Sequence, residues 1–565
     1  MAGVGAALWG RDTDPPAVPQ RRIAHAAGAT MPHGAPIMKG WRSARRRVGD
    51  ATGLGISAVK AWRQSGLSLP VNPLTGVRLG RDLFVHGVSP GIGWAAGAAR
   101  HPDSPAVIDT HGYHLTQREA EDLTRRATTA LRERGLRSGV TAAVLGRNSA
   151  GFAVAIAAVA RTGADLVYLN PGFSADQIAD LCQRLGVGLV LADPDLRSQV
   201  PAGIPSADLA FPESWAAAGG APFRIAPGGG RHIILTSGTT GRPKGADRSR
   251  TPLEATVSLL SALPYRELGV HVMAAPLFHS WGWLNHRIDG LLDSLEIMVP
   301  RPDAAAVLDA AARHRASLVI TTPVVVSRLA DAGPGDRDLS ALRGVLVSGA
   351  PIPPDVTGAF RRRFGDVLYN LYGSTEVGYA TVAGPQDLAE APTTAGRPLP
   401  GVTVALLDPD GRPTAAGTPG DVWVGSSAAF DGYVDGGDKE RSTDGLVATG
   451  DVGVFDDSGR LFIRGRSDDL IISGGENVHP TEVEEVLRRC PGVADVAAVG
   501  RPDDAFGQRV VCYVVPTADA DAGTLADEVL AYAARSLAPY QRPRETYLIG
   551  ELPRNETGKV LRRLL

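Results

Sequence analysis

The sequence predicts an α/β protein in which a large N-terminal domain of parallel-rich sheets layered with helices precedes a small α+β C-terminal domain. From about residue 50 to residue 465, short apolar runs alternate with amphipathic stretches, which is typical of parallel strands covered by helices. After about Gly465 the pattern changes to a compact mixture of strands and helices of roughly 100 residues, large enough for a domain. The length of 565 residues also exceeds what one hydrophobic core usually supports.

The N-terminal part contains the repeated strand–helix pattern. Its apolar runs have the length of buried strands, and the stretches between them have helical periodicity. Strands joined by helices in this way lie parallel in a sheet that helices cover on both faces. The predicted helices are 153–161, 175–185, 304–314 and 354–364, and the predicted strands are 166–169, 189–192, 318–321, 345–347 and 367–371.

The C-terminal part has strand-like runs at 461–464, 470–472, 493–499 and 509–515, with helices at 480–489 and 524–536. The first of these helices opens with Pro480 near its first position and with Thr481-x-x-Glu484, the pattern of a capping box. The polar segment 466–469 is the expected linker. We therefore expect an Arg-, Pro-, Gly- and Ala-rich disordered extension at 1–49, one domain at 50–466 and a second at 467–565.

Composition excludes several classes of protein. The 58 basic and 60 acidic side chains give a formal net charge of −2, so no general attraction to nucleic acid is expected. Three cysteines far apart in the chain do not form a disulfide scaffold or a CxxC metal site. The longest apolar run, 152–160, is shorter than the roughly 20 residues that a membrane span needs, and Met1–Gly10 lacks the basic start of a signal peptide. We expect a cytoplasmic protein, with contact at the membrane periphery left open.

Lysine is rare in this chain. The 58 basic residues include only five lysines, so most surface cations are arginine. A lysine that remains is more often found where a compact ammonium on a flexible stem is required. Lys244 and Lys559 are two of the five.

The most informative segment is Ile233-Ile-Leu-Thr-Ser-Gly-Thr-Thr-Gly-Arg-Pro-Lys-Gly245. An apolar strand leads into a loop rich in glycine and hydroxyl side chains that ends in a lysine, and such a loop can turn N–H groups, hydroxyls and an ammonium toward an anion. It differs from a Walker A loop, because Pro243 precedes Lys244 and Gly245 follows it. The segment predicts a phosphate-binding loop of another kind.

This loop resembles the phosphate loop of the adenylate-forming enzymes, the family of acyl-CoA synthetases, luciferases and peptide-synthetase adenylation domains. Further strings follow in the order that this family shows, and the resemblance covers about residues 80–565. They are Tyr372-Gly-Ser-Thr-Glu376, Thr449-Gly-Asp451, Gly465-Arg-Ser-Asp-Asp-Leu-Ile-Ile-Ser-Gly-Gly-Glu-Asn-Val478 and Pro553-Arg-Asn-Glu-Thr-Gly-Lys559. The resemblance implies an acid–thiol ligase of the AMP-forming type.

The chemistry explains why such residues are needed. A carboxylate is a poor acyl donor, but its attack on the α-phosphorus of ATP gives an acyl-adenylate with AMP as leaving group. A thiol such as that of coenzyme A then displaces AMP. The first step brings an anion to a polyanion, so it needs cations and oriented donors where charge develops. Mg²⁺ is expected at the phosphates, and hard oxygen ligands suit it.

The resemblance also implies the role of each site residue. Glu376 would hold Mg²⁺, Thr375 would contact phosphate or the substrate carboxylate, and His279 would lie beside that carboxylate. Asp451 and Arg466 would bind the ribose, and Lys559 would bridge the carboxylate and the α-phosphate. The remaining ATP-binding residues would be Thr236, Ser237, Gly238, Thr239, Thr240, Gly241 and Lys244 around the phosphates, with Gly349, Ala350, Pro351, Tyr372, Gly373 and Ser374 around the adenine and its neighbouring turn.

Two half-reactions require two arrangements, because Lys559 cannot stay at the carboxylate while a thiol arrives by the same approach. The resemblance implies that the C-terminal domain is mobile and rotates about Asp468. Ser473, Gly474 and Gly475 would then line the coenzyme A passage, where glycines leave room for pantetheine. The expected partners are thus a small-molecule carboxylic acid, ATP and coenzyme A.

A medium- or long-chain fatty acid is the expected substrate, since Trp281, Trp283, Gly378 and the pair 274–275 are small or apolar near the expected acyl pocket. A fatty acyl-AMP ligase, an aryl or short-chain acid–CoA ligase and a catalytically silent nucleotide-binding homologue stay open as alternatives. Luciferase-like oxygenation has no motif in its favour. A peptide-synthetase domain is disfavoured because no Ser-bearing carrier motif is present. The histidines form no HxxxH or HExxH pair, so no zinc site is predicted.

Overall fold

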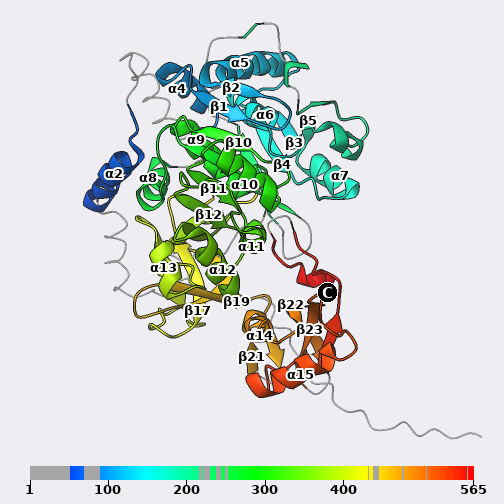
Figure 1. The fold of residues 1–565 in the computed structure, drawn as a ribbon. Helices are drawn as coiled ribbons and strands as arrows, with labels where there is room; N and C mark the ends of the chain where they lie inside the picture. Colours follow the sequence, from blue (N-terminus) through cyan, green and yellow to red (C-terminus); the bar gives the residue numbers. More distant parts are fainter. Residues whose placement is uncertain are drawn as a thin grey trace, which may run out of the picture.

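The structure is a computed structural model, and it confirms the predicted α/β architecture (Figure 1). The N-terminal extension and part of the phosphate loop lie outside the described residues. The structure describes residues 51–68, 89–210, 212–214, 219–220, 230–236, 243–248, 252–430, 432–434, 436, 444–473, 476–503, 506–555 and 558–565.

The larger sheet of the N-terminal part has the strand order β15-β14-β13-β12-β11-β9-β10-β1-β2. Its central strands from β1 to β13 pair in parallel, while β2, β14 and β15 add antiparallel edges. The strands are β1 (Pro105–Ile108), β2 (His114–Thr116), β9 (Val270–Met273), β10 (Leu295–Met298), β11 (Leu318–Thr321), β12 (Gly344–Ser348), β13 (Leu368–Ser374), β14 (Gly378–Ala383) and β15 (Arg397–Pro398).

A second sheet has the order β6-β5-β3-β4-β7-β8, with all pairs parallel except the β7–β8 hairpin. A third, fully antiparallel sheet has the order β16-β17-β18-β19. The strands are β3 (Thr141–Leu145), β4 (Asp165–Leu169), β5 (Val187–Ala192), β6 (Ser206–Asp208), β7 (His232–Thr236) and β8 (Lys244–Asp247), then β16 (Thr403–Leu407), β17 (Gly420–Gly425), β18 (Val447–Phe455) and β19 (Leu461–Arg466).

Helices cover these sheets, as the parallel pairing requires. Figure 1 shows α2 at one edge of the molecule beside α8, and α5 and α6 over the second sheet. The helices are α2 (Ala51–Ser65), α4 (Gly93–Arg100), α5 (Gln117–Glu133), α6 (Ala150–Thr162), α7 (Ala175–Arg184), α8 (Leu253–Ala262), α9 (Ser280–Leu291), α10 (Ala304–Arg313), α11 (Pro323–Ala332), α12 (Pro354–Phe364) and α13 (Pro385–Glu390), with short 3-10 turns at Pro194–Gln199, Pro212–Ser214 and Arg562–Leu564.

The main core lies between the two parallel sheets. Helix α6 is buried at every position: its sequence is apolar on all sides up to Ala160, and the buried Arg161 pairs with Glu121. Ser149 caps its start by accepting a hydrogen bond from the Phe152 amide at 3.1 Å, and Gly163 ends it at a φ of 81°. The same core contains residues from both sheets, such as Tyr168 and Ile320. The outer faces pack separately, against α10, α11 and α12 on the larger sheet and against α7 on the second.

The C-terminal part forms its own sheet and core. Figure 1 shows it as a separate lobe below the larger domain. Its first strand begins after the segment 467–470, but the proposed limits 50–466 and 467–565 stay a prediction. The elements are β20 (Ile471–Ser473), β21 (Glu476–Val478), β22 (Val493–Asp503), β23 (Gly507–Pro516), β24 (Glu545–Leu548), α14 (Pro480–Leu487) and α15 (Leu525–Ser536).

The predicted capping box of α14 is wrong. His479 is the residue before the helix, and it makes no side-chain cap. Thr481 lies inside the first turn and donates its hydroxyl to the carbonyl of Arg464. Glu484 accepts the Ala498 amide at 2.8 Å, so tertiary contacts take both side chains that the local pattern assigned to the cap. The three cysteines are free and buried, as their spacing predicts.

Candidate active site

The predicted phosphate loop joins the two strands of the β7–β8 hairpin. Thr236 ends β7 and is paired in register with Lys244, the first residue of β8. The Lys244 ammonium lies 5.1 Å from the centre of the Tyr433 ring. The predicted residues 237–241 lie outside the described residues. The described ends of the hairpin therefore place the lysine beside a tyrosine that the sequence did not single out.

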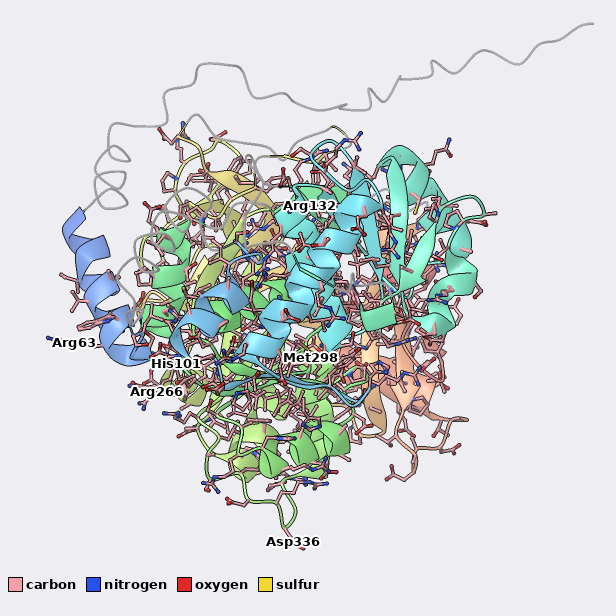
Figure 2. The ribbon with its side chains drawn as sticks, turned by 90° about the horizontal axis from the view of Figure 1, so that it is seen from above. Arg63, His101, Arg132, Arg266, Met298 and Asp336 are labelled. Atoms are coloured by element: carbon pink, nitrogen blue, oxygen red, sulfur yellow. The ribbon has the colours of Figure 1, made fainter. Side chains whose placement is uncertain are left out.

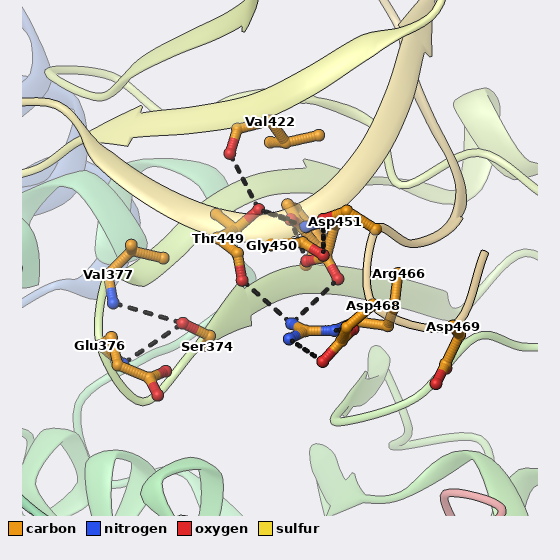
Figure 3. Close-up of polar contacts among 12 residues, drawn as sticks. Ser374, Glu376, Val377, Val422, Thr449, Gly450, Asp451, Arg466, Asp468 and Asp469 are labelled. Atoms are coloured by element: carbon orange, nitrogen blue, oxygen red, sulfur yellow. Dashed lines mark hydrogen bonds and ion pairs between the residues drawn. The ribbon is translucent and has the colours of Figure 1, made fainter. Parts of the chain in front are cut away.

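A tight turn after β13 presents Thr375 and Glu376. The Ser374 hydroxyl accepts the Glu376 amide at 3.3 Å and the Val377 amide at 3.4 Å (Figure 3). The Glu376 carboxylate then accepts the Tyr433 hydroxyl at 2.7 Å. Tyr433 thus connects the lysine of the phosphate loop with the predicted Mg²⁺ ligand.

A second polar network joins β13 with β18 and β19. The Tyr372 hydroxyl donates to Asp451 at 2.6 Å. Thr449 donates to the Val422 carbonyl at 2.9 Å and accepts the Asp451 amide at 3.1 Å, which fixes the backbone before the carboxylate. Arg466 donates to the Thr449 carbonyl at 2.9 Å and lies 3.4 Å from the Asp451 carboxylate (Figure 3). The structure therefore brings together three residues predicted to bind adenosine.

Burial and ion pairing set the charges of this network. Burial raises the pKa of Asp451, although Tyr372, Arg466 and Lys559 each act to lower it. Burial would also raise the pKa of Asp468, but the hydrogen bond and charge of Arg466, with a contribution from Lys559, bring it below its usual value. The pKa of Arg466 is raised despite burial because Asp468 and Asp451 stabilise its charge.

The segment that carries Lys559 reaches the N-terminal domain. Gly558 has a φ of 87°, and a side chain there would collide with Val324 at the start of α11. The Lys559 side chain is exposed, yet its positive charge acts on Asp451 and Asp468. Figure 1 shows the C-terminal segment extending from its lobe toward α11. The lysine therefore lies on the same side of the site as the predicted ribose-binding residues.

The predicted hinge residue, Asp468, and the residue after it form ion pairs in opposite directions along the chain. Asp468 pairs with Arg466 of β19 at 3.0 Å, on the N-terminal side. Asp469 pairs with Arg562 at 3.3 Å, and Arg562 also pairs with Glu484 at 2.7 Å inside the C-terminal domain. Asp468 is thus bound by a residue that precedes the linker, and Asp469 is bound by a residue near the C-terminus.

The residues predicted to meet the acid carboxylate, Thr375 and His279, lie at the start of α9. The Thr375 hydroxyl donates to the Ser280 hydroxyl at 3.4 Å, and His279 occupies the position before the helix. Burial lowers the pKa of His279 to about 4, so its imidazole is neutral near pH 7. Burial raises the pKa of the nearby Tyr379, and Ser280 acts to lower it. A substrate carboxylate at this place would be surrounded by neutral hydrogen-bonding groups, the hydroxyls of Thr375 and Ser280 and the imidazole of His279.

The turn predicted to lie against the adenine follows β12. Ser348 donates to the Leu371 carbonyl at 3.0 Å, which ties the ends of β12 and β13 together. Gly349 has a φ of 109°, a conformation that side-chain-bearing residues rarely adopt, and Ala350 and Pro351 continue the turn. Position 373 also requires glycine, because a side chain there would collide with the backbone of Gly378 across the hairpin.

Ser473, predicted to contact coenzyme A, lies in the C-terminal sheet, where it pairs with Glu476 and with Gly507. Gly474 and Gly475 lie outside the described residues. Among described contacts, the structure joins Ser473 to its own domain and not to the residues around Asp451.

The donor chemistry at Glu376 fits Mg²⁺, because a partly buried carboxylate supplies the hard oxygen that this ion prefers. Elsewhere among the described residues, His101, Glu267 and Asp293 bring potential ligand atoms within 4.8 Å of one another. Arg100 already pairs with Asp293 at 2.6 Å there, which neutralises that carboxylate. A surface hollow of about 620 Å³ contains none of the predicted site residues, so we do not place the reaction there.

Sequence reasoning missed Tyr433, Ser280 and Tyr379. Tyr433 is 57 residues from the carboxylate that it contacts, and its place depends on a bridge between its backbone and Ala246 of β8. Only the position of Ser280 directly after His279 could have singled it out. These contacts arise from folding, so no local motif carries them.

The chain matches two family models. Residues 94–434 match the AMP-binding enzyme model and residues 482–559 match the model of the AMP-binding enzyme C-terminal domain. The chain belongs to the AMP-binding enzyme family of adenylate-forming enzymes. In the part of the chain that the structure describes, no helix combines the length and apolar character needed to cross a membrane.

Relatives with known names agree with this family. A fatty acid–[acyl-carrier-protein] ligase from Streptomyces coeruleorubidus is 30% identical over 83% of this chain and 94% of its own length. A sulfoacetate–CoA ligase from Cupriavidus necator is 34% identical over 58% of this chain and 65% of its own length. The structure of o-succinylbenzoate CoA synthetase from Bacillus subtilis with its acyl-adenylate matches with a TM-score of 0.75 and 26% identity, over 83% of this chain and 97% of that one.

The protein is therefore an AMP-forming acid–thiol ligase. It activates a small-molecule carboxylic acid with ATP through an acyl-adenylate, and coenzyme A accepts the acyl group.

Proposed function

We propose that this ligase uses Lys244, Glu376, Asp451 and Lys559 as its catalytic and ATP-binding centre. The observation that supports this most strongly is the docking of the Lys559 segment beside α11, where its charge reaches Asp451 and Asp468. In this arrangement the enzyme is poised for adenylate formation, since the residue before the lysine packs against Val324 of the N-terminal domain.

Each of these residues has a separate role in the first half-reaction. Lys244 neutralises charge on the departing pyrophosphate, and Asp451 with Arg466 orients the ribose so that the α-phosphorus faces the acid. Lys559 stabilises the charge that develops between the carboxylate and that phosphorus. Mg²⁺, when bound at Glu376, supplies further positive charge at the phosphates.

The acid carboxylate binds between Thr375, Ser280 and His279. A neutral His279 donates a hydrogen bond without trapping the nucleophile in an ion pair, because burial keeps its pKa at about 4. The carboxylate therefore keeps its negative charge for attack on phosphorus.

The second half-reaction requires the C-terminal domain to rotate about Asp468. The ion pair between Arg466 and Asp468 belongs to the arrangement described above, and the rotation breaks it. The turn at Ser473 then replaces Lys559 at the adenylate and guides the thiol of coenzyme A.

The acid itself is proposed to be a fatty acid of medium or long chain. Trp281 and Trp283 are buried on α9, Ala275 is buried shortly before it, and these residues supply apolar walls. The Streptomyces relative is named for a fatty acid. Two other matches favour an acid with a second anionic group, because sulfoacetate and o-succinylbenzoate each carry one. An acid whose chain ends in an anion is the second candidate.

The experiment that tests this function is acid-dependent release of pyrophosphate and AMP by the purified enzyme, with and without coenzyme A. Fatty, aryl and short acids are compared at one concentration. Pyrophosphate release that depends on the acid, with thioester formed only when coenzyme A is present, supports the proposal. ATP binding without pyrophosphate release from any acid would contradict it and favour a silent homologue.

We also propose that the protein contacts an anionic membrane surface through α2. Ile56, Val59 and Trp62 are 70%, 51% and 61% exposed, and their spacing places them on one helix face. Lys60 lies beside this face and Arg63 lies within it, and Figure 2 shows Arg63 and Arg266 along the same edge of the molecule. A helix with an apolar stripe and basic neighbours is suited to lie in a lipid interface.

A further inference from the structure

Lys559 lies in a short turn whose backbone is fixed by its own hydrogen bonds. An antiparallel bridge between Arg554 and Val560 closes the turn at its base. Inside it, the Asn555 amide donates to the Lys559 carbonyl at 2.9 Å, and the Lys559 amide donates to the side-chain oxygen of Asn555 at 2.8 Å. The position of the lysine backbone therefore depends on what holds this turn to the rest of the protein.

Arg562, three residues after Lys559, holds the turn from its C-terminal side. Its guanidinium lies 2.7 Å from the Glu484 carboxylate of α14 and 3.3 Å from the Asp469 carboxylate. Its Nε donates to the Ala498 carbonyl of β22 at 3.2 Å. One side chain thus joins the lysine segment to a helix, to a strand and to the residue that follows the proposed hinge.

The N-terminal side of the turn has a more exposed anchor. Arg554 donates to the Asp495 carboxylate of β22 at 2.5 Å and to the Gly558 carbonyl at 2.5 Å. The Asp495 side chain is 27% exposed, whereas that of Glu484, the partner of Arg562, is 6% exposed. Because water and salt screen a sheltered ion pair less than an exposed one, we expect Arg562 to be the stronger anchor.

Two carboxylates set the charge of Arg562. Burial acts to lower its pKa, but the charge and hydrogen bond of Glu484, with the charge of Asp469, raise it above the usual value of arginine. The same Glu484 oxygen that meets the guanidinium also accepts the Ala498 amide at 2.8 Å. The arginine therefore meets a carboxylate that β22 has already oriented.

The pair with Asp469 connects this anchor to the proposed hinge. Asp469 directly follows Asp468, whose carboxylate pairs with Arg466 of β19. A rotation about Asp468 would carry Asp469 with it, and Arg562 would transmit that movement to a segment three residues from Lys559. The lysine and the end of the linker would then move together.

We infer that Arg562 is a positioning residue for Lys559, which holds the lysine turn in one place on the moving domain by pairing with Glu484 and Asp469. This inference deepens the proposed function and rests on it, because it requires that Lys559 acts at the substrate carboxylate and the α-phosphate. A displacement of about 1 Å at a reacting group can cost about a hundredfold in rate. The anchor of the turn is therefore expected to influence adenylation although it acts only through the lysine.

The test measures both half-reactions of the full-length enzyme with Arg562→Met, which keeps much of the side-chain length without the charge. The probe is octanoate, or the fastest acid of the comparison above if octanoate is not used. We expect kcat for pyrophosphate release to fall at least tenfold while KM for ATP and for the acid changes less than threefold, because Lys559 stabilises the transition state. Thioester formation from the supplied acyl-adenylate is expected to stay within threefold of wild type.

A double-variant cycle separates positioning from general support of the fold. Arg562→Met is made in the wild type and in the Lys559→Ala enzyme. If the arginine acts through the lysine, its loss is expected to change the residual pyrophosphate release of Lys559→Ala by less than twofold. Arg562→Lys keeps the charge and is expected to recover part of kcat. Arg563→Met, at the exposed neighbouring arginine, is the matched control and is expected to keep the wild-type rate in both half-reactions.

A second variant avoids leaving the buried Glu484 carboxylate without its arginine. Asp469→Asn removes only the linker partner, which is less buried than Glu484. It is expected to lower kcat for pyrophosphate release about threefold, the size of effect that a partly exposed ion pair supports, with an unchanged thermal unfolding temperature. This effect is also expected to disappear in the Lys559→Ala enzyme.

The outcomes separate this inference from the proposed function. Wild-type pyrophosphate release by Arg562→Met and Asp469→Asn overturns the inference and leaves the proposed function standing. The same holds if Arg562→Met lowers both half-reactions equally, or lowers pyrophosphate release as much in Lys559→Ala as in the wild type. Full pyrophosphate release by Lys559→Ala alone contradicts the proposed role of the lysine, and the inference falls with it.

Discussion

The hydroxyl of Tyr433 holds the carboxylate of Glu376 at 2.7 Å and the ring of Tyr433 faces Lys244. One side chain thus contacts two groups that we propose meet the phosphates, one in the turn after β13 and one at the start of β8. Because Glu376 is the proposed Mg²⁺ ligand, Tyr433 acts as a positioning residue outside the ion's own ligands. Groups of this kind adjust how readily a metal ligand adopts its bound orientation.

Tyr433→Phe is therefore expected to raise the Mg²⁺ concentration needed for half-maximal pyrophosphate release by about fivefold, the effect of one hydrogen bond of about 1 kcal/mol. The readout is a Mg²⁺ titration at saturating ATP and acid. Tyr547→Phe, at an exposed tyrosine of the C-terminal sheet, is the control. A variant with an unchanged Mg²⁺ requirement and a lower maximal rate would mean that the tyrosine has another role.

Single residues were predictable from sequence only where a motif contains them. Thr236, Lys244, Glu376, Asp451 and Lys559 belong to strings whose residue types suit phosphate, metal or ribose. Thr236 and Lys244 pair across one hairpin, but Asp451 lies inside β18, so the motifs alone do not account for the arrangement of these residues.

Tyr433, Arg248 and Arg287 were missed for a physical reason. Tyr433 contacts the Glu376 carboxylate and Arg248 lies near the Gly378 turn, both distant in sequence, whereas Arg287 stacks on Trp283 of its own helix. A buried arginine on a largely apolar helix has no local signal that separates it from an exposed one. Only the packed interior reveals its environment.

Among the elements, α2 has a face whose composition differs from that of a solvated helix. The stripe of Ile56, Val59 and Trp62 adjoins Lys60 and Arg63. Upstream in the chain, Lys39, Arg42 and the run 45–47 add basic residues, although they lie outside the described residues. The apolar and basic residues that support the proposed membrane contact are thus concentrated near one end of the chain.

We expect the full-length protein to sediment with phosphatidylcholine vesicles that contain phosphatidylglycerol and not with phosphatidylcholine vesicles alone. The double substitution Val59→Gln and Trp62→Gln is expected to lower this binding at least tenfold, because each inserted apolar side chain contributes about 1.5–3 kcal/mol. Tyr540→Gln, at an exposed aromatic residue of the C-terminal domain, is the matched control. Equal binding to both vesicle types would refute an electrostatic contact, and an undiminished double variant would refute the role of α2.

The linker is the second element with a testable role. Asp468→Pro fixes the backbone φ at the proposed hinge, so it is expected to impair thioester formation from supplied acyl-adenylate at least tenfold while pyrophosphate release largely persists. Asp468→Ala removes the same side chain without restricting the backbone, and it separates the two effects. A proline variant that loses mainly pyrophosphate release would place the hinge elsewhere.

Strands and helices were largely predictable, because apolar periodicity and burial agree along most of the chain. The helix predicted at 354–364 and the strand predicted at 318–321 match α12 and β11 in full. The capping box of α14 was wrong because Thr481 and Glu484 bond to Arg464, Ala498 and Arg562 instead. Tertiary partners replaced a local pattern at a point where two domains meet.

For the whole molecule, buried histidines make stability depend on pH. The ring of His232 lies 2.7 Å from the Tyr168 hydroxyl, and burial lowers its pKa to about 3 from an ordinary value of about 6.5. The unfolded chain binds a proton below about pH 6.5 that the folded chain excludes, so this group destabilises the fold progressively as the pH falls toward 3.

The expected contribution is about 1.4 kcal/mol per pH unit within that window. Denaturant unfolding of wild type and His232→Gln between pH 7 and pH 4 measures it, and the difference in slope isolates this histidine from the other titrating groups. The variant is expected to lose less stability on acidification than the wild type. Parallel curves would show that His232 is protonated in the folded state.

The central claim concerns the two domains together: one lysine of the C-terminal segment serves adenylation and then withdraws. The direct measurement is Lys559→Ala assayed in both half-reactions, with Arg563→Ala in the same segment as control. We predict that pyrophosphate release falls at least about a hundredfold, since the cation at the developing charge is lost, while thioester formation from supplied acyl-adenylate persists. Equal loss of both half-reactions would contradict the account.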